Sequence, residues 1–448
     1  MISKRQIFFC AAIFGIFLSA LSHAQTDVHL RAETGARLRL PVEIWPTDVR
    51  ENATRKHSEM VVSVLESDLW LSSLIDPKAV KDTTILRDEA AFAKNLLPAQ
   101  RRIRVAIRSS IAVKGDQATL SANLLDLNTH RILGSRNLTG CEPNLRLLIH
   151  ALSDEIVSIL TGEEGIAKSR IVFTASSFEG KELYAMDYDG ANLQQLTSQG
   201  SLNLNPAWST GARGVIYTSY VRGNPDLYAF EFESGKSAPV VRGDGMYSSP
   251  AWSPDGNALL FVSTRHGNAE IYMMNVRTRA VTRLTHHPSI DSSPSWSPTG
   301  RQIVFTSDRL GNPQLFLMGA EGTDVQRLPA EGEYNDSPVW SPRGDKIAYV
   351  SRSSGGFEIC VYDLTTETST QLTQSQGSNE DPTWAPDGYR IAFTSTRNGG
   401  KDVYSMMWDG TAIERLTLKG TCESPSWSSN VRPQSHFNCD GNESRSGK

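Results

Sequence analysis

The chain has few cysteines, little net charge and no apolar run long enough to cross a bilayer. Its 448 residues include five cysteines, with no CxxC pair and no Cys/His ligand spacing, so we expect neither a bound metal nor a cofactor. A formal net charge of −4 without a block of like charges argues against a nucleic-acid partner. With 39% hydrophobic and 21% charged residues, the composition is that of an ordinary soluble globular protein.

The N-terminus has the three parts of a secretory signal peptide. Lys4 and Arg5 precede an apolar run over 7–21, and small residues stand just before Gln25. The alternative is a membrane anchor, but this run is shorter than the roughly 20 apolar residues that span a bilayer. We therefore expect residues 1–24 to be removed and the chain to be exported without a membrane span. Export permits disulfides, and Cys422 and Cys439 can either pair or stay free.

An internal repeat dominates the second half of the chain. Six tryptophans follow one another at intervals of 44, 44, 44, 44 and 43 residues, each with a proline two positions before it. Most repeats continue into a turn such as Ser253-Pro254-Asp255-Gly256, in which proline presets the first turn position and glycine accepts a positive φ. The tryptophans are Trp208, Trp252, Trp296, Trp340, Trp384 and Trp427.

The sequence pattern of each repeat predicts four short antiparallel strands. An alternating apolar run such as 303–307 follows the turn, then a loop with glycine, then a third strand such as 271–274. A fourth short strand ends in Leu-Thr or a close variant, as in Leu284-Thr285. Four strands in about 44 residues are typical of a propeller blade.

The ends of the array predict a closed ring of six blades. The segment 171–174 has the pattern of a second strand without a tryptophan strand before it, and Trp427 lies on a first strand without a second strand after it. Joining the two ends completes one blade and leaves no open sheet edge. We therefore predict an all-β six-bladed propeller over residues 169–430, followed by a polar, disordered tail over 431–448.

Residues 25–168 lack this period and predict a small N-terminal α/β domain. Strand-like patterns cover 38–45, 102–113, 118–127 and 131–138. Apolar residues recur at helical spacing over 58–74 and again over 145–160, where Thr161-Gly162 ends the second helix.

A search for catalytic or metal-binding motifs is negative. No Gly-x-Ser-x-Gly elbow is present, so a propeller-linked hydrolase is a poor match. Gly235-Lys236-Ser237 lacks the first glycine of a phosphate loop and is interpreted as a turn. His286 and His287 are neighbours that point to opposite faces of a strand, and no third ligand has suitable spacing. Asp189-Gly190 and Asp409-Gly410 are interpreted as hairpin turns rather than calcium ligands.

The short polar segment before each tryptophan strand is the candidate binding site. Because the first strand of a blade lines the centre of a propeller, these six entrance loops gather around one opening. They can be turns that cap their own backbone, or together they can form a mildly acidic docking surface for a protein segment. The candidate residues are Asn203, Asn205, Tyr247, Ser248, Asp291, Ser292, Asn335, Asp336, Asn379, Glu380, Asp381 and Glu423.

These features together resemble the TolB family, the periplasmic propellers of the Tol–Pal system. The resemblance rests on Arg170-Ile171-Val172-Phe173, on the repeated Pro-x-Trp-Ser-Pro-x-Gly turn, and on the Ile-Tyr-Met-Met and Arg-Leu-Thr elements. The helix with the sequence HALSDEIV (150–157), followed by LTGEEG (160–165), is similar to the domain junction of that family. The likeness extends to about Trp427, and the tail with Cys439 has no obvious counterpart.

The resemblance implies a non-enzymatic periplasmic adaptor in outer-membrane integrity and cell division. It implies binding of the peptidoglycan-associated lipoprotein Pal at the entrance loops. By analogy with the Asp/Glu-Val start of the family, it implies binding of TolA through Asp27, Val28, His29, Leu30, Arg31, Ala32 and Glu33. The segment 41–46 departs from the family pattern, which weakens the transfer of TolA contacts.

Two other functions are open at this point, and we expect a monomer in each case. The first is a periplasmic propeller enzyme that acts on an oligosaccharide, with Asp336 and Glu380 as acid and base. The second is a general binding module for another exported ligand.

Overall fold

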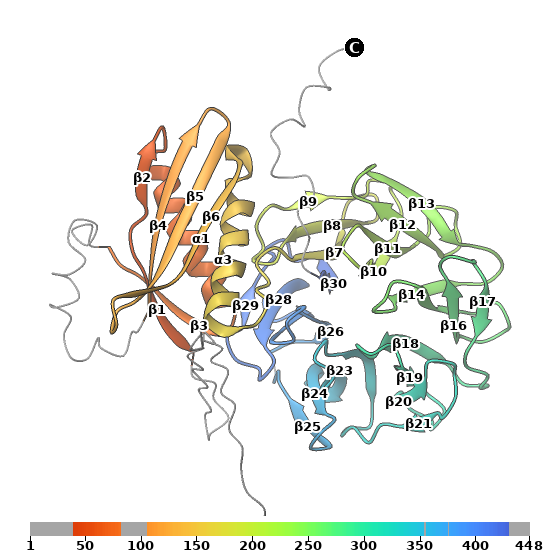
Figure 1. The fold of residues 1–448 in the computed structure, drawn as a ribbon. Coiled ribbons are helices and arrows are strands. Elements are labelled where there is room, and N and C mark those ends of the chain that lie inside the picture. Colours follow the sequence, from red (N-terminus) through yellow and green to blue (C-terminus); the bar gives the residue numbers. More distant parts are fainter. Residues whose placement is uncertain (1–38, 82–104, 354, 375, 430–448) are drawn as a thin grey trace, which may run out of the picture. The chain divides into compact units, whose positions relative to one another are not determined.

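The computed structural model describes residues 39–81, 105–353, 355–374 and 376–429 (Figure 1). They belong to one compact unit that begins at Arg39. The predicted signal peptide, the 27–33 segment and the predicted tail lie outside the described residues. No helix among the described ranges is long and apolar enough to pass through a bilayer.

In residues 39–81 and 105–161, the N-terminal part has a six-stranded mixed sheet and two α-helices (Figure 1). The strand order is β3-β1-β4-β5-β6, and β2 also pairs with β4. Strands β1, β2 and β3 run parallel to their partners, whereas β4, β5 and β6 form an antiparallel meander. The elements are β1 (Leu40–Ile44), β2 (Asp48–Glu51), α1 (Arg55–Leu71), β3 (Ile75–Ala79), β4 (Val105–Lys114), β5 (Gln117–Asp126), β6 (Arg131–Cys141), a 3-10 turn (Glu142–Asn144) and α3 (Leu145–Thr161).

Helices α1 and α3 pack against each other and share one core with the sheet. Val61, Leu65 and Leu69 of α1 lie one helical turn apart and are buried, which places them on a single face. Leu152 and Ile156 of α3 enter the same core. The two amphipathic helices thus pack their apolar faces against the sheet and form one core with it.

The sequence predicted most of these elements but missed two short strands. The expected helices and the strands over 38–45, 102–113, 118–127 and 131–138 are present, with ends shifted by a few residues. Strand β2 escaped detection because it is short and charged (Asp48-Val49-Arg50-Glu51). Strand β3 contains Pro77, which a ladder accepts only where its missing N–H is not needed. Gly162 ends α3 in the left-handed conformation, as predicted.

The C-terminal part is a six-bladed β-propeller, as predicted, with four antiparallel strands in each blade (Figure 1). Blades 1 to 3 contain β10 (Asn203–Trp208), β11 (Gly214–Ser219), β12 (Asp226–Glu231), β13 (Lys236–Val241); β14 (Tyr247–Trp252), β15 (Ala258–Ser263), β16 (Glu270–Asn275), β17 (Val281–Arg283); and β18 (Asp291–Trp296), β19 (Gln302–Ser307), β20 (Gln314–Gly319), β21 (Gln326–Arg327). Blades 4 and 5 contain β22 (Asn335–Trp340), β23 (Lys346–Ser353), β24 (Gly356–Asp363), β25 (Thr368–Gln371); and β26 (Asn379–Trp384), β27 (Arg390–Ser395), β28 (Asp402–Met407), β29 (Glu414–Arg415).

The sixth blade joins both ends of the array and is called the closing blade below. Its first strand, β30 (Cys422–Trp427), pairs with β7 (Arg170–Ser176), which is followed by β8 (Lys181–Asp187) and β9 (Gln194–Gln195). The indole Nε1 of Trp427 donates a hydrogen bond of 2.8 Å to Ser169 Oγ, just before β7. The predicted closure is therefore confirmed.

A buried polar clamp, not recognised in the sequence, links the third and fourth strands of a blade and in three places also binds the first strand of the next blade. An acidic residue or glutamine lies within the first three residues of the third strand of each blade, and these residues recur every 44 positions. In blade 4, Glu358 accepts hydrogen bonds from Thr373 and Asn379. The same Thr373 hydroxyl accepts the Ile359 N–H, which explains the repeated Leu-Thr. The series is Glu182, Asp226, Glu270, Gln314, Glu358 and Asp402.

Of the two alternatives that the sequence left open for Cys422, the structure has the unpaired thiol. Cys360 and Cys422 are buried free thiols, so Cys422 forms no disulfide in this structure. Burial raises the pKa of the Cys360 thiol to about 12, which keeps it protonated. Cys141, at the end of β6, is disulfide-bonded.

Candidate functional site

The first strands of the six blades form the inner wall of the ring. Each of β10, β14, β18, β22, β26 and β30 contacts the next, and β30 contacts β10. The entrance loops lie at the start of these strands, as the repeat predicted. The site is therefore built from equivalent positions of six blades.

A β-bulge shapes every entrance loop. The third residue of each first strand has a positive φ between 48° and 53°, and the ladder to the second strand shifts register around it. Apart from glycine, small polar residues tolerate a left-handed backbone conformation best. This requirement accounts for the recurring residues at this position, which are Asn205, Ser249, Ser293, Ser337, Asp381 and Ser424.

The first residue of each entrance loop is buried, and its side chain contacts its own blade or the preceding one. Asn203 donates to Glu182 of the closing blade, and Asn379 donates to Glu358 of blade 4, so these clamp residues each bind the next blade. Asp291 forms an ion pair of 3.0 Å with Arg309. Of the predicted partner-binding residues, those in this inward position are Asn203, Tyr247, Asp291, Asn335 and Asn379. Their side chains hold the propeller together in this structure, and direct contact with a partner stays a prediction.

The second and third residues of the loops link neighbouring blades. Asp336 of blade 4 accepts a hydrogen bond of 2.8 Å from Thr306 of blade 3. Asp381 of blade 5 accepts one of 3.1 Å from Ser424 of the closing blade. Burial and the neighbouring Glu380 raise the pKa of the Asp381 carboxyl above its ordinary value, against the effect of that hydrogen bond. Ser248, Ser292 and Glu380 are half-buried, and Asn205 is exposed.

Lysines neutralise part of the predicted acidic field. Glu423 is buried and contacts Lys181 of its own blade and, at 2.7 Å, Lys401 of blade 5. Burial alone would raise the pKa of Glu423, but the two ammonium groups lower it below its ordinary value. With Asp291 also ion-paired, the opening carries less free negative charge than the list of carboxylates suggested.

An apolar rim, which the sequence analysis did not single out, borders half of the opening. The residue just before the first strand is exposed and apolar in three consecutive blades, with exposed fractions of 41%, 47% and 51% for Leu202, Met246 and Ile290. Their carbonyls accept hydrogen bonds from the loop after the second strand, where Val221 and Leu310 are also exposed. At the equivalent positions the other blades have Tyr334, Ser378 and Thr421.

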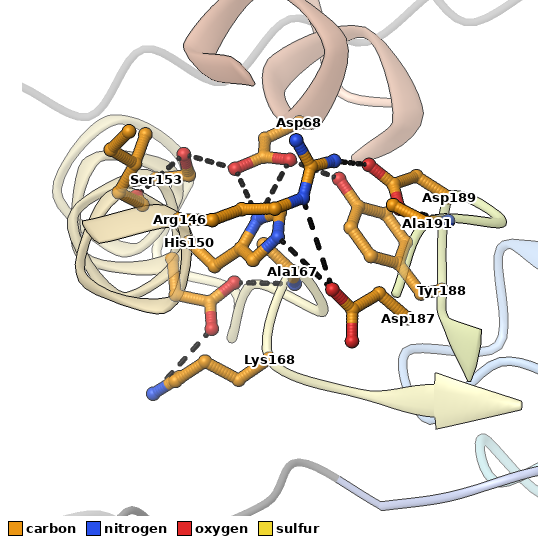
Figure 2. A network of polar contacts seen from close by, with 12 residues as sticks. Asp68, Arg146, His150, Ser153, Ala167, Lys168, Asp187, Tyr188, Asp189 and Ala191 are labelled. Carbon is orange, nitrogen blue, oxygen red and sulfur yellow. Dashed lines mark hydrogen bonds and ion pairs between the residues drawn. The ribbon is translucent and has the colours of Figure 1, made fainter. Parts of the chain in front are cut away.

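A second polar site joins the helices of the N-terminal part to the closing blade (Figure 2). The carboxylate of Asp68 on α1 is fully buried and accepts three hydrogen bonds. They come from His150 Nδ1 at 2.9 Å and Ser153 Oγ at 2.6 Å, both on α3, and from the Tyr188 hydroxyl at 2.7 Å. Tyr188 lies in the turn after β8. Burial and Asp68 raise the pKa of Tyr188 well above its ordinary value, so the phenol stays protonated and donates.

The other charges of this site are paired as well. Arg146 of α3 forms ion pairs with Asp189 and, at 3.8 Å, with Asp187. Ligand atoms of Asp68, His150 and Asp189 lie within 4.8 Å of one another, as in a metal site. The Arg146 guanidinium already supplies the positive charge there, so we interpret the group as an ionic cluster.

The connector between α3 and β7 is fixed by Asp154. Its Oδ1 accepts the Ala167 N–H at 2.7 Å, and its Oδ2 lies 3.5 Å from Lys168 Nζ. Burial raises the pKa of Asp154 to about 6, partly offset by Lys168. A Cβ on Gly165 would come within 2.5 Å of the Asp154 Cα, so only glycine fits. Asp154 and Gly165 of the 150–165 motif are therefore needed for the close packing of this junction.

A family model described as the TolB beta propeller domain matches residues 157–431. The chain belongs to the TolB family. The TolB crystal structure from Acinetobacter baumannii covers 88% of this chain and 97% of its own, with a TM-score of 0.76 and 24% identity, which supports the fold.

Relatives by sequence point to the same family but match only in part. A TolB homolog from Chlorobium chlorochromatii is 38% identical over 212 residues, which are 42% of this chain and 48% of the relative. The Tol-Pal system protein TolB of Geobacter sulfurreducens is 44% identical over 111 residues, 25% of this chain and 26% of the relative. The matched parts thus span about a half and a quarter of these relatives.

Proposed function

We propose that this TolB family member is a non-enzymatic periplasmic adaptor of the Tol–Pal system. In this proposal it binds Pal at the entrance loops and TolA through residues 27–33, and it supports outer-membrane integrity and cell division. The observation that supports Pal docking is the apolar rim. Exposed apolar side chains that recur beside a polar opening are typical of surfaces that bind proteins.

The rim and the loops supply complementary parts of a protein interface. Leu202, Met246 and Ile290 offer apolar area that is removed from water on binding, which is the main source of affinity. The polar half of the opening, with Glu380, Asp381 and the Lys181–Glu423–Lys401 group, offers hydrogen bonds and charges that fix orientation. Such a surface fits a partner segment that is apolar on one side and polar on the other.

No observation among the described residues favours the alternative of an oligosaccharide-cleaving enzyme. The two carboxylates proposed as acid and base are engaged in structural hydrogen bonds, Asp336 with Thr306 and Glu380 with Ser378. We therefore propose the adaptor function rather than the enzymatic one.

The first test measures affinity for the purified periplasmic domain of Pal by calorimetry. We expect a combined Met246→Glu and Ile290→Glu variant to bind Pal at least about tenfold more weakly, because two charges would be desolvated in the interface. The matched control is Ile132→Glu with Leu133→Glu. These residues have exposed fractions of 59% and 42% but lie on β6, away from the propeller.

The outcome separates docking from folding. Unchanged binding by the rim variant, with an intact melting transition, would show that the apolar rim is not the Pal surface. Rim residues are preferable to the loop carboxylates for this test, because Asp336 holds two blades together and its reversal disturbs the ring itself.

The TolA contact is tested separately by deleting residues 27–33. We expect the deletion to abolish capture of the TolA C-terminal domain while the Pal affinity stays within about twofold, since the propeller is untouched. The measurement is surface plasmon resonance with both partners. Retained TolA capture would place that contact elsewhere in the chain.

A further inference from the structure

His150 is placed between carboxylates of two different parts of the chain. Its Nδ1 lies 2.9 Å from Asp68 of α1, and its Nε2 lies 3.9 Å from Asp187 at the end of β8. A neutral imidazole has only one N–H, so one of its nitrogens would turn a lone pair towards a carboxylate. The protonated ring has an N–H on both sides. Both carboxylates therefore favour the charged form, Asp68 through a hydrogen bond and Asp187 through a longer-range attraction.

The surrounding charges favour the same form. Asp68 from α1, together with Asp187 and Asp189 from the closing blade, faces His150, and Arg146 of α3 is the nearest cation (Figure 2). Three carboxylates therefore meet one guanidinium unless His150 is protonated. Of the remaining neighbours, the Tyr188 phenol is neutral and Asp154 is paired with Lys168. Arg170 is a further cation, on the far side of Asp187.

We propose that His150 is a pH-dependent latch between the N-terminal α/β part and the closing blade of the propeller. When protonated, it ties Asp68 of α1 to Asp187 of β8 and fixes the position of the blade beside the helices. When it loses its proton, the attraction to Asp187 disappears and excess negative charge remains in the junction. The contact then weakens, which makes the coupling between the two parts dependent on the pH of the compartment. The latch acts within the chain, whichever partners the protein binds.

The direction of the pH effect follows from the pKa. Burial alone would lower the pKa of His150, but Asp68 outweighs it, and the pKa is raised above the ordinary value of about 6.5. A group whose pKa is higher in the closed junction than in the open one stabilises closure. That stabilisation is complete below about pH 6.5 and is lost as the pH rises through the higher value.

The test uses residues 25–448 and measures two quantities. Titration of the His150 ring protons by NMR gives the pKa directly, with the signal assigned from a His150→Gln variant. Hydrogen exchange of the Tyr188 and Gly190 amides between pH 6 and pH 8.5, corrected for intrinsic rates, reports opening of the junction. In the unsubstituted chain, we expect the protection of these amides against exchange to fall between pH 6 and pH 8.5. The fall should be about tenfold for each unit by which the pKa of His150 exceeds 6.5. The His150→Gln variant should lack this dependence.

His57→Gln is the matched control. His57 also contacts a carboxylate, Glu142 at 3.1 Å, but that pair lies within the α/β part. The His57→Gln substitution should therefore leave the pH dependence of the junction unchanged. A His150 pKa at or below 6.5, or an unchanged pH dependence in His150→Gln, would overturn the latch. If His150→Gln does not fold, Asp187→Asn serves instead and should lower the His150 pKa, whereas an unchanged value would count against the proposal.

Discussion

Replacing Asp68 by alanine is expected to lower the free energy of unfolding by about 3–5 kcal/mol, the usual cost of removing one partner from a buried charged group. The variant leaves His150, Ser153 and the Tyr188 hydroxyl without their common acceptor in a site closed to water. Since these donors come from α3 and the closing blade, the loss affects both parts of the chain. The measurement is urea unfolding followed by tryptophan fluorescence.

Asp48→Ala is the control for this prediction. Asp48 forms an ion pair of 3.0 Å with Arg50, but both side chains are largely exposed, at 41% and 61%. Exposed pairs contribute at most about 1 kcal/mol, so this variant should unfold almost like the original chain. Similar losses for Asp68→Ala and Asp48→Ala would mean that the junction cluster adds no stability.

The second large effect is expected for Trp427→Ala, at about 3–5 kcal/mol of lost stability. Trp427 is buried, donates to Ser169 and packs on the residues where the closing blade joins the two ends of the array. Weakening this blade frees the β7 edge, and unpaired edges promote aggregation. We expect a lower urea midpoint together with faster aggregation on heating, measured by light scattering.

Trp252→Ala is the matched change in another blade. Trp252 occupies the equivalent repeat position, but it is half-buried and its Nε1 has no hydrogen-bond partner among the described residues. It should therefore cost less stability and should not promote aggregation. Equal effects of the two substitutions would show that the closing blade has no special part in stability.

The sequence alone determined the fold because its signals are local and repeated. The Pro-x-Trp turn, the alternating strands and Leu-Thr recur about every 44 residues, so the same short-range pattern specifies each blade. The unpaired patterns at 171–174 and Trp427 were enough to predict how the ring closes. Helices α1 and α3 were found for a related reason, since their apolar faces have helical spacing.

Only the tertiary structure decided what the individual polar residues do. Asn203 and Asp291 looked available for a partner in the sequence, but both are buried, where Asn203 donates to Glu182 of the closing blade and Asp291 pairs with Arg309. Asp189 was recognised only as a turn residue, although its carboxylate also pairs with Arg146. Asp68 meets His150 across 82 positions and Tyr188 across 120. Such contacts arise from packing, and no short-range pattern encodes them, because burial and hydrogen-bond partners depend on segments far apart in the chain.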